Sequence, residues 1–314
     1  MERFQPEKLR FQYSEQPSAL QIHTGETPYL SFRALDETGL VKNAFSTRFG
    51  GVSEGYLSSL NFSYTKEGES AEAVTENYKR MAGALDVDSR RMVVSWQTAT
   101  TNVRVVTKRD EGKGIFRERD YRDIDGLICN VPGITLVTLY ADCVPLYFLD
   151  PVQKAIGLSH SGWRGTVLGM GKETIRAMDT AYGCDPSDLI CCIGPSICKD
   201  CFEVGGEVAA AFLKSFGAED ASRIIYRAVH ADGKEPVSRA DIMHLAVTGL
   251  GSLHEEKYYI DLWEANRIVL QRAGVPAEHI FTAGLCTKCN SDQMWSHRAS
   301  GNRRGNLAAF LTLI

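Results

Sequence analysis

The chain has 314 residues, of which 44% are hydrophobic and 24% are charged, and this composition is typical of a globular protein with a large buried core. The formal net charge of -4 gives no reason to expect a nucleic acid or an anionic membrane as a partner, so the expected substrate is a small molecule. The charged N-terminal segment predicts no secretory signal, and no run reaches the roughly 18 apolar residues of a membrane span. Nine scattered cysteines, an odd number, fit a reducing compartment, so we expect the protein in the cytoplasm.

Apolar runs and helical patterns alternate along the chain. In chain order they predict a helix at 72–85, strands at 92–96, 103–107, 126–131, 134–140, 146–149 and 155–159, a helix at 166–182, a strand at 189–193, and helices at 207–216 and 262–273. Asp261, with Glu264 three residues later, is the expected N-cap of the last helix. The alternation predicts a single layered domain of the α/β or α+β class, with its core at about 40–314 and an N-terminal extension at about 1–30.

Cys143 and His160 lie just past the ends of two predicted strands, where a side chain can face a cleft. A thiolate and an imidazole are strong zinc ligands, and together they also act as a nucleophile and its base. A buried free cysteine with a core histidine is the plain alternative. Asp142 and the segment 162–165 place charge and glycine beside the pair, which favours a functional site.

Several polar segments offer groups that can hold a substrate. The start of the helix at 166–182, together with Arg164, predicts an anion site, because free backbone N–H groups and the helix dipole favour negative charge. Arg48 precedes paired glycines that permit a close ligand approach, and it can hold a phosphate or a carboxylate with two hydrogen bonds. Asn61 and Gln97 lie in similar polar segments, which a simple turn explains equally well.

Two Cys-x-x-Cys pairs, Cys198 with Cys201 and Cys286 with Cys289, form a further candidate site. Such pairs make a four-cysteine zinc site when they meet in space. The 84 residues between the pairs are far outside zinc-ribbon spacing, so the sequence disfavours that site. A basic segment at 296–305, broken by glycines, either covers a site or is only surface.

Seven motifs taken together resemble the YfiH family, also called the laccase-domain or multicopper polyphenol oxidase-like family. In chain order they are TRFGGVS at 47–53, SLN at 59–61, ADCVP at 141–145, HSGWRG at 160–165, IGPSI at 193–197, FEV at 202–204 and SHR at 296–298. The two central motifs are highly specific, and the match runs from about residue 40 to the C-terminus. The resemblance implies an α/β sandwich of layered mixed sheets, related to cysteine deamidase toxins, that holds one zinc ion.

The resemblance also implies three zinc ligands, which are a histidine of a Gln-x-His motif, the cysteine of ADC and the histidine of HSGWRG. The last two are Cys143 and His160, whereas the first falls on Ala99, which has no donor atom. Because a catalytic zinc site uses three protein ligands and an open position, two ligands predict low zinc occupancy, with copper as an alternative metal. We interpret Ala99 as a deliberate His-to-Ala replacement that inactivates the enzyme; a naturally degenerate family member is the alternative.

A true laccase is excluded by the histidine count. Multicopper oxidation needs many histidines, commonly in His-x-His pairs, and this chain has seven histidines and no such pair. Members of the family are described as purine nucleoside phosphorylases acting on adenosine, inosine, guanosine and methylthioadenosine, with adenosine deaminase activity. The resemblance therefore implies a purine nucleoside and phosphate as substrates.

For that reaction we hypothesise the following roles. Arg48 and Arg164 would hold phosphate, and Asn61 and Gln97 would orient the base or the sugar by hydrogen bonds. The catalytic set is Cys143, His160 and Arg48, and the substrate-binding set is Arg48, Asn61, Gln97, Asp142 and Arg164.

Two alternatives stay open. Some relatives are described as peptidoglycan editing factors, which remove a wrongly attached amino acid from a UDP-MurNAc precursor, and in that case Cys143 or a zinc-bound water would hydrolyse an amide. The second alternative is a non-catalytic, ligand-binding protein. Phosphate dependence separates the two enzymes, because phosphorolysis needs phosphate and amide hydrolysis does not.

Overall fold

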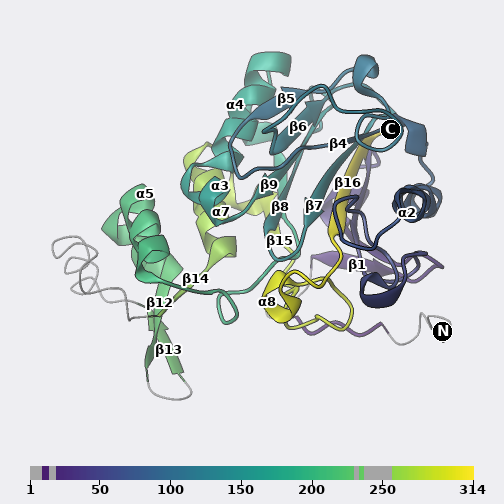
Figure 1. Ribbon diagram of the computed structural model, residues 1–314. Coiled ribbons are helices and arrows are strands. Elements are labelled where there is room, and N and C mark those ends of the chain that lie inside the picture. The colour runs from purple at the N-terminus through teal and green to yellow at the C-terminus, as the bar shows by residue number, and fades with distance from the viewer. Residues whose placement is uncertain (1–8, 14–18, 230–232, 237–256) are drawn as a thin grey trace.

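The computed structural model describes residues 9–13, 19–229, 233–236 and 257–314. In these ranges two six-stranded sheets are stacked on each other, and a four-stranded sheet lies at one side (Figure 1). The first sheet has the order β1 (Leu20–His23), β2 (Tyr29–Phe32), β3 (Val41–Ser46), β16 (Leu307–Leu313), β7 (Thr135–Tyr140), β4 (Met92–Val94). The second has the order β15 (Ile280–Thr282), β10 (Ile190–Ile193), β8 (Val144–Asp150), β9 (Ala155–Ser161), β6 (Gly126–Cys129), β5 (Val103–Val105). The third has the order β11 (Glu203–Val204), β14 (Tyr258–Ile260), β12 (Ile225–Val229), β13 (Gly233–Pro236).

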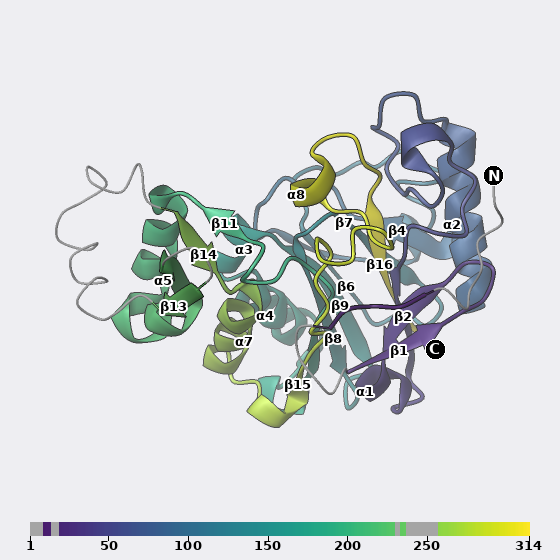
Figure 2. The ribbon, with the colours of Figure 1, turned by 90° about the horizontal axis from the view of Figure 1, so that it is seen from below.

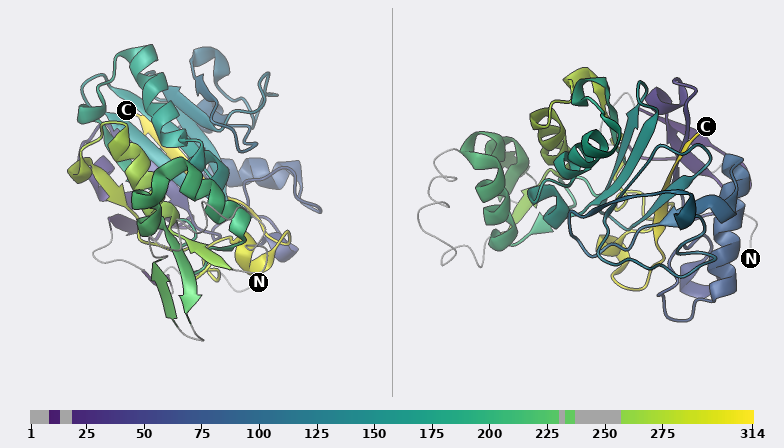
Figure 3. Two further views of the ribbon diagram at one scale, coloured as in Figure 1. Left: turned by 90° about the vertical axis from the view of Figure 1, so that its left-hand side faces the viewer. Right: turned by 90° about the horizontal axis from the view of Figure 1, so that it is seen from above.

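The described residues form seven α-helices. They are α1 (Arg33–Asp36), α2 (Ala71–Leu85), α3 (Trp163–Val167), α4 (Met170–Tyr182), α5 (Gly206–Ile224), α7 (Leu262–Arg272) and α8 (His297–Ser300). The α2 helix packs on the first sheet, whereas α4 and α7 pack on the second, so the sheets lie between two helical layers (Figures 2 and 3). None of the described helices is long and apolar enough to span a bilayer.

One large core cluster lies between the two large sheets, where apolar side chains of β3, β7 and β16 face those of β6, β8 and β9. Two buried tyrosines join the sheets across this core. The Tyr147 hydroxyl donates to the Ala44 carbonyl at 2.8 Å, and the Tyr140 hydroxyl donates to the Ser159 carbonyl at 3.1 Å. Since a buried tyrosine needs a partner for its hydroxyl, these bonds favour one relative placement of the sheets.

The predicted mixed layered fold is confirmed, and local signals explain several of its elements. The α2 helix begins where the Ser70 side chain accepts a hydrogen bond from the Ala73 amide, and it ends at Asp86, whose φ of 52° is left-handed. The α7 helix begins at the predicted cap, because the Asp261 carboxylate accepts from the Glu264 amide at 3.0 Å.

Two predicted helices differ from the structure. The pattern at 166–182 is not one helix, because α3 ends before Leu168 and α4 begins after Gly169, whose φ of 78° is left-handed. The helix predicted at 207–216 continues to Ile224, with non-helical dihedral angles at Gly217. In both places a glycine takes a positive φ that interrupts the helical geometry.

The largest omission from the sequence prediction concerns the first sheet. Its central strand β16 and its strands β1 to β3 were not predicted, although β16 pairs with both β3 and β7. The segment 20–32, expected within an N-terminal extension, instead supplies β1 and β2. The two ends of the described chain thus meet in one sheet.

Candidate functional site

Cys143 and His160 lie side by side because their strands form a hairpin. The β8 strand pairs antiparallel with β9, and the register places Val144 opposite Ser161 and Pro145 opposite His160. Cys143 directly precedes β8, and its sulfur lies close enough to the His160 ring to act on the pKa of the imidazole. A Cβ on Gly162 would lie 3.1 Å from the Cys143 sulfur and 3.5 Å from the His160 ring, so the glycine leaves room for the pair.

Asp125 completes this group from the neighbouring strand. It directly precedes β6, which pairs with β9, and its buried carboxylate accepts a hydrogen bond from His160 Nδ1 at 2.8 Å. The same carboxylate accepts from the backbone amides of residues 98, 99 and 100. Asp125 therefore fixes the orientation of the His160 ring and holds the loop that follows β4 against it.

The charges in this group favour a protonated His160. Burial by itself lowers the pKa of His160, but the Cys143 sulfur and the Asp125 carboxylate outweigh burial and raise the pKa to about 9. Burial likewise opposes ionisation of Asp125, yet its hydrogen bonds from His160 and from the backbone lower its pKa overall. The ring nitrogen not bonded to Asp125, Nε2, is the one available to Cys143 or to a ligand.

Ala99 occupies the place where the resemblance implies a third zinc ligand. Its amide donates to the same Asp125 oxygen that accepts from His160, so position 99 lies beside the pair. Its φ of 63° is left-handed, a region in which histidine is enriched relative to most residues. The backbone here is therefore suited to a histidine, but the residues present supply two donors and do not complete a three-ligand metal site.

Two cavities meet at Cys143. The first, here called the Gln97 cavity, has a volume of about 440 Å³ and is lined by Gln97, Arg119, His160 and Arg304, among others. The second, the Trp163 cavity, has a volume of about 260 Å³ and is lined by Asp142, Trp163, Ile197, Phe202, Leu262, His297 and Arg298. Ala141, Cys143 and Arg304 line both. A larger cavity near α1 and β15 contains none of the predicted site residues.

The Gln97 cavity is lined by a positive side chain, Arg304, whose guanidinium makes no ion pair with the described residues. Arg304 donates to the Gly305 carbonyl and to the Asn306 side chain, while its buried Nε has no hydrogen-bond partner. Burial lowers the pKa of Arg304, and no ion pair of the described residues involves it. Burial and nearby Arg304 also lower the pKa of Lys66, to about 8. This group of cations is suited to an anionic ligand.

The structure does not bring Arg48 or Arg164 into these cavities. The Arg48 guanidinium donates to the carbonyls of Ser291 and Ser58 and stacks on the Trp295 ring, 3.8 Å from its centroid. Arg164 is exposed and lies over the Trp163 ring within α3. Because α3 begins at Trp163 and has five residues, the anion site predicted at the start of a long helix is not formed.

Asn61 is also committed to the protein itself. Its side chain, fully buried, bonds to Ser63, Glu69 and Asn306, so it holds loops together and lines neither cavity. Gln97 does line a cavity, with its amide bonded to the backbone of Leu139. Thus the structure brings Gln97 to the Cys143–His160 pair, and not Asn61.

Asp142 lies beside Cys143 in a left-handed conformation, with φ of 86°. Its carboxylate accepts from the Thr287 hydroxyl at 2.6 Å and from the Arg298 amide at 2.7 Å. It lines the Trp163 cavity, while both of its carboxylate oxygens are held by the C-terminal part of the chain. The basic segment at 296–305 therefore covers the site, since Arg298 and Arg304 also line it.

The spacing argument against a meeting of the two Cys-x-x-Cys pairs is wrong. Cys198, Cys201, Cys286 and Cys289 meet, and their sulfur atoms all lie within 4.8 Å of one another. A search of the described residues for three or more neighbouring His, Cys, Asp or Glu side chains finds these four cysteines. The cluster does not include Cys143 or His160.

Sequence reasoning missed Asp125, Arg119 and Arg304. Asp125 directly precedes a predicted strand, and an antiparallel neighbour brings the start of that strand to the end of β9, so the signal was present but the pairing was not known. Arg304 lies in the basic segment that was left undecided. Arg119 follows no motif, and its place over the Trp96 ring comes from the fold.

The fold and the site define a layered α/β protein with a Cys–His–Asp group at the junction of two cavities. Residues 42–314 match the family model described as multi-copper polyphenol oxidoreductase laccase. The chain is 33% identical over 271 residues to purine nucleoside phosphorylase YlmD of Bacillus subtilis, with 85% of this chain and 86% of that protein covered. It is 32% identical over 240 residues to adenosine deaminase RL5 of an unknown prokaryotic organism, with 76% and 81% covered.

A solved structure agrees with these matches. The crystal structure of YlmD from Geobacillus stearothermophilus superposes with a TM-score of 0.79 at 29% identity, covering 95% of this chain and 99% of that one. The chain therefore belongs to the YfiH family of laccase-like proteins.

Proposed function

We propose that the chain binds a purine nucleoside together with inorganic phosphate, and that Ala99 weakens its turnover. The relatives named purine nucleoside phosphorylase and adenosine deaminase support the substrate class. The observation that carries the proposal is a cavity that places the cations Arg304 and Arg119 beside His160. A cationic subsite next to a proton-carrying side chain suits phosphate attack on a glycosidic bond.

Phosphate would bind at Arg304. Its guanidinium lines both cavities, and the low-dielectric surroundings of this half-buried side chain strengthen its charge interaction with an anion. The positive charge of Arg304 contributes to the lowered pKa of Lys66, so the two side chains repel each other. A bound phosphate dianion would relieve this repulsion. Arg119, on the wall of the same cavity, adds a further positive charge.

The base would occupy the Trp163 cavity. Trp163, Phe202, Ile197 and Leu262 give this cavity aromatic and aliphatic walls, which suit a flat heterocycle. Cys143 and Arg304 line both cavities, so a nucleoside that spans them places its bond between base and sugar beside Cys143 and His160. In this arrangement Gln97 faces the sugar.

His160 would supply the proton. Attack by a phosphate oxygen forms a bond to C1′ while the bond from C1′ to the base breaks, and the departing base takes a proton. With its pKa near 9, His160 is protonated at neutral pH, and Nε2 is the donor because Asp125 holds Nδ1. The chain lacks a third ligand at this site, so we assign no step to a metal there.

One observation favours a second function, amide hydrolysis. Cys143, His160 and Asp125 lie in series as thiol, imidazole and carboxylate, the order found in cysteine hydrolases. In that reaction the Cys143 sulfur attacks the carbonyl carbon and the amine leaves with a proton from His160, after which water cleaves the resulting thioester, releasing the acid and restoring the thiol. Such a reaction needs no phosphate.

The test compares the parent chain with Ala99→His, using adenosine and inosine with and without phosphate. We expect both proteins to bind nucleoside by calorimetry, and the Ala99→His protein to release free purine base only when phosphate is present. Cys143→Ala in the Ala99→His background is the matched control and should return the rate to the parent level. Absence of nucleoside binding to both proteins would overturn the proposal. Phosphate-independent hydrolysis of an amide by the parent would support the second function instead.

A further inference from the structure

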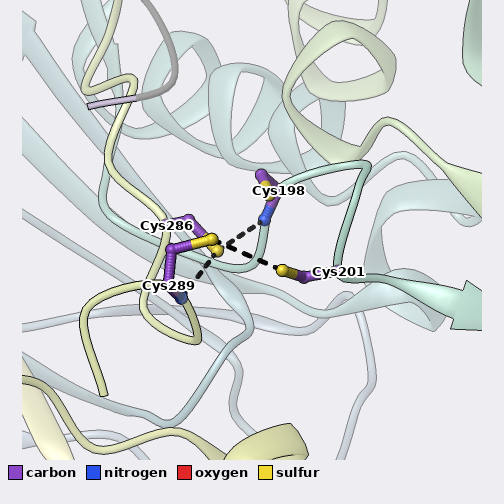
Figure 4. A group of neighbouring side chains, drawn as sticks. All are labelled: Cys198, Cys201, Cys286 and Cys289. Atoms are coloured by element: carbon purple, nitrogen blue, oxygen red, sulfur yellow. Dashed lines mark hydrogen bonds between the residues drawn. The ribbon is translucent and has the colours of Figure 1, made fainter. Parts of the chain in front are cut away.

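Two loops that are distant in sequence bring four cysteines together at one edge of the second sheet (Figure 4). Cys198 and Cys201 follow β10, whereas Cys286 and Cys289 follow β15. The strands β10 and β15 are parallel neighbours, so their carboxyl ends lie at the same edge and the loops that follow them meet. The number of residues between the two pairs therefore has no bearing on the distance between their sulfurs.

The backbone fixes the two loops against each other independently of the sulfurs. Ser196 bridges to Cys286 in parallel fashion, with its amide donating to the Leu285 carbonyl and its carbonyl accepting from the Thr287 amide, both at 3.2 Å. The Trp263 ring nitrogen donates to the Ser196 hydroxyl. The four cysteines thus project from a rigid base, which is what a preorganised ligand set requires.

The sulfur geometry suits a single tetrahedral ion. With zinc–sulfur bonds of about 2.3 Å, sulfurs in a tetrahedral site are about 3.8 Å apart. The observed sulfur–sulfur distances lie around that value, since the sulfurs of Cys201 and Cys289 are 3.5 Å apart and all four sulfurs are within 4.8 Å of one another. Closing the set around one ion needs shifts of less than about 1 Å.

The backbone also donates to the cluster. The amides of Cys198 and Cys289 point at the Cys286 sulfur, at 3.3 and 3.4 Å (Figure 4). Hydrogen bonds of this kind favour a negatively charged sulfur. Each pair is a Cys-x-x-Cys turn, and in the second turn the amide of the last cysteine donates to the first sulfur.

The electrostatics of the cluster call for a cation. The sulfurs of Cys201 and Cys289 are 3.5 Å apart, and all four sulfurs lie within 4.8 Å of one another. Negative charge on several adjacent sulfurs is unfavourable unless a positive ion offsets it. A divalent ion does so, because ligand deprotonation and metal binding are coupled.

We propose that Cys198, Cys201, Cys286 and Cys289 form a structural zinc site, distinct from the Cys143–His160 pocket. Four protein ligands leave no open position, which is the mark of a structural site and not of a catalytic one. Zinc binding displaces the four thiol protons and joins the loop after β10 to the loop after β15.

The zinc site would also position the pocket wall. Thr287, next to Cys286, donates to the Asp142 carboxylate at 2.6 Å, and Asp142 adjoins Cys143. The Arg298 side chain donates to the Cys201 carbonyl at 3.3 Å, while its amide donates to Asp142 at 2.7 Å. Zinc therefore acts at a distance, by holding the two loops that hold Asp142.

The first test counts metal in the full chain purified under reducing conditions and dialysed against zinc. We expect close to one zinc per chain, and X-ray absorption at the zinc edge should show four sulfur neighbours at about 2.3 Å. Mixed sulfur and nitrogen neighbours, iron in place of zinc, or a Cys201–Cys289 disulfide without metal would each overturn the proposal. This measurement needs no variant, so it does not depend on whether a mutant folds.

The second test locates the zinc. The double variant Cys201→Ser/Cys289→Ser should lose at least 90% of the bound zinc, or roughly a tenfold drop in occupancy at the same free zinc, because two of four ligands are lost. Cys129→Ser is the matched control, since Cys129 is another free thiol and lies outside the cluster. Cys143→Ser should also keep its zinc. Retention of zinc in the double variant, or loss in Cys143→Ser, would contradict the assignment.

Discussion

At the pair Cys143–His160 and at the cluster Cys198–Cys201–Cys286–Cys289, sequence and structure disagree about metal binding in opposite directions. The pair lies within motifs whose resemblance to the family implies a zinc site, yet position 99 offers no donor and only two ligands are present. The cluster lies in pairs whose spacing argued against zinc, yet four sulfurs lie within 4.8 Å. Motifs report what a family does, whereas the completeness of a ligand set is a property of the folded chain.

The two regions also differ in how they treat charge. Around the pair, Asp125 and the Cys143 sulfur stabilise a cation on His160, and Arg304 adds positive charge at the cavity wall. In the cluster, the neighbouring sulfurs disfavour one another's ionisation. We therefore propose a proton and an anionic ligand at the pair, and a cation at the cluster.

The largest expected effect is the gain of a second metal site in Ala99→His. The affinity of the pocket for zinc should rise more than about 100-fold, because even residues that only support metal ligands are worth about 10- to 100-fold. The left-handed backbone at position 99 accepts histidine, so folding should be retained. Metal analysis should give two zinc ions per chain against one in the parent. An unchanged count would show that position 99 does not face the pair.

A chelator should destabilise the parent through the cluster. Zinc held at 100 times its dissociation constant contributes about 2.7 kcal/mol, which corresponds to a fall in Tm of about 4 °C for a chain of this size. Differential scanning fluorimetry with a strong zinc chelator measures the shift. Cys289→Ser should show a lower Tm that the chelator no longer changes, and Cys129→Ser should respond as the parent does. A Cys289→Ser protein whose Tm still falls on addition of the chelator would contradict a zinc site at the four cysteines.

Phosphate binding should depend on Arg304 and not on Arg48. Loss of charge-assisted hydrogen bonds costs about 1.5–3 kcal/mol, so Arg304→Ala should weaken phosphate binding about 10- to 100-fold by calorimetry. Arg303→Ala is the matched control, because Arg303 is exposed and lies over the Tyr56 ring. Arg48→Ala should lower stability, through loss of its contacts with Trp295 and two carbonyls, more than it lowers phosphate affinity. Equal losses in Arg303→Ala and Arg304→Ala would refute the assignment.

The smallest expected effect is a pH dependence from His160. Its pKa is raised from 6.5 to about 9 in the folded chain, so its protonated form stabilises the fold fully below pH 6.5 and less as the pH rises through 9. The free energy of unfolding of the parent relative to His160→Asn should therefore fall by about 1 kcal/mol or more between pH 6.5 and 9.5. Denaturant unfolding at a series of pH values measures it. A difference that grows with pH would contradict the proton on His160.

The sequence predicted the strand ends of the site but not their partners. Cys143 and His160 were found because both lie at ends of clear apolar runs, and a hairpin brings such ends together. Asp125 was not found, because its role depends on β6 lying beside β9. Arg48 was assigned by side-chain chemistry alone, and only the fold shows its guanidinium bound to carbonyls and Trp295.

The fold prediction was limited in the same way. Helices with strong caps, such as α2 and α7, were predicted close to their observed bounds. The β16 strand was missed, although it lies at the centre of the first sheet, because its pairing with β3 and β7 joins residues far apart in sequence. The spacing of the cysteines led to a wrong expectation for the same reason. The pairing of the parallel strands β10 and β15, and not the number of intervening residues, sets the distance between the two Cys-x-x-Cys pairs.

The most direct test of the comparison is an anomalous difference map at the zinc edge from crystals of the parent chain grown with one equivalent of zinc. The account predicts one strong peak at the centre of Cys198, Cys201, Cys286 and Cys289, and none between Cys143 and His160. A peak between Cys143 and His160 with none among the four cysteines would contradict it.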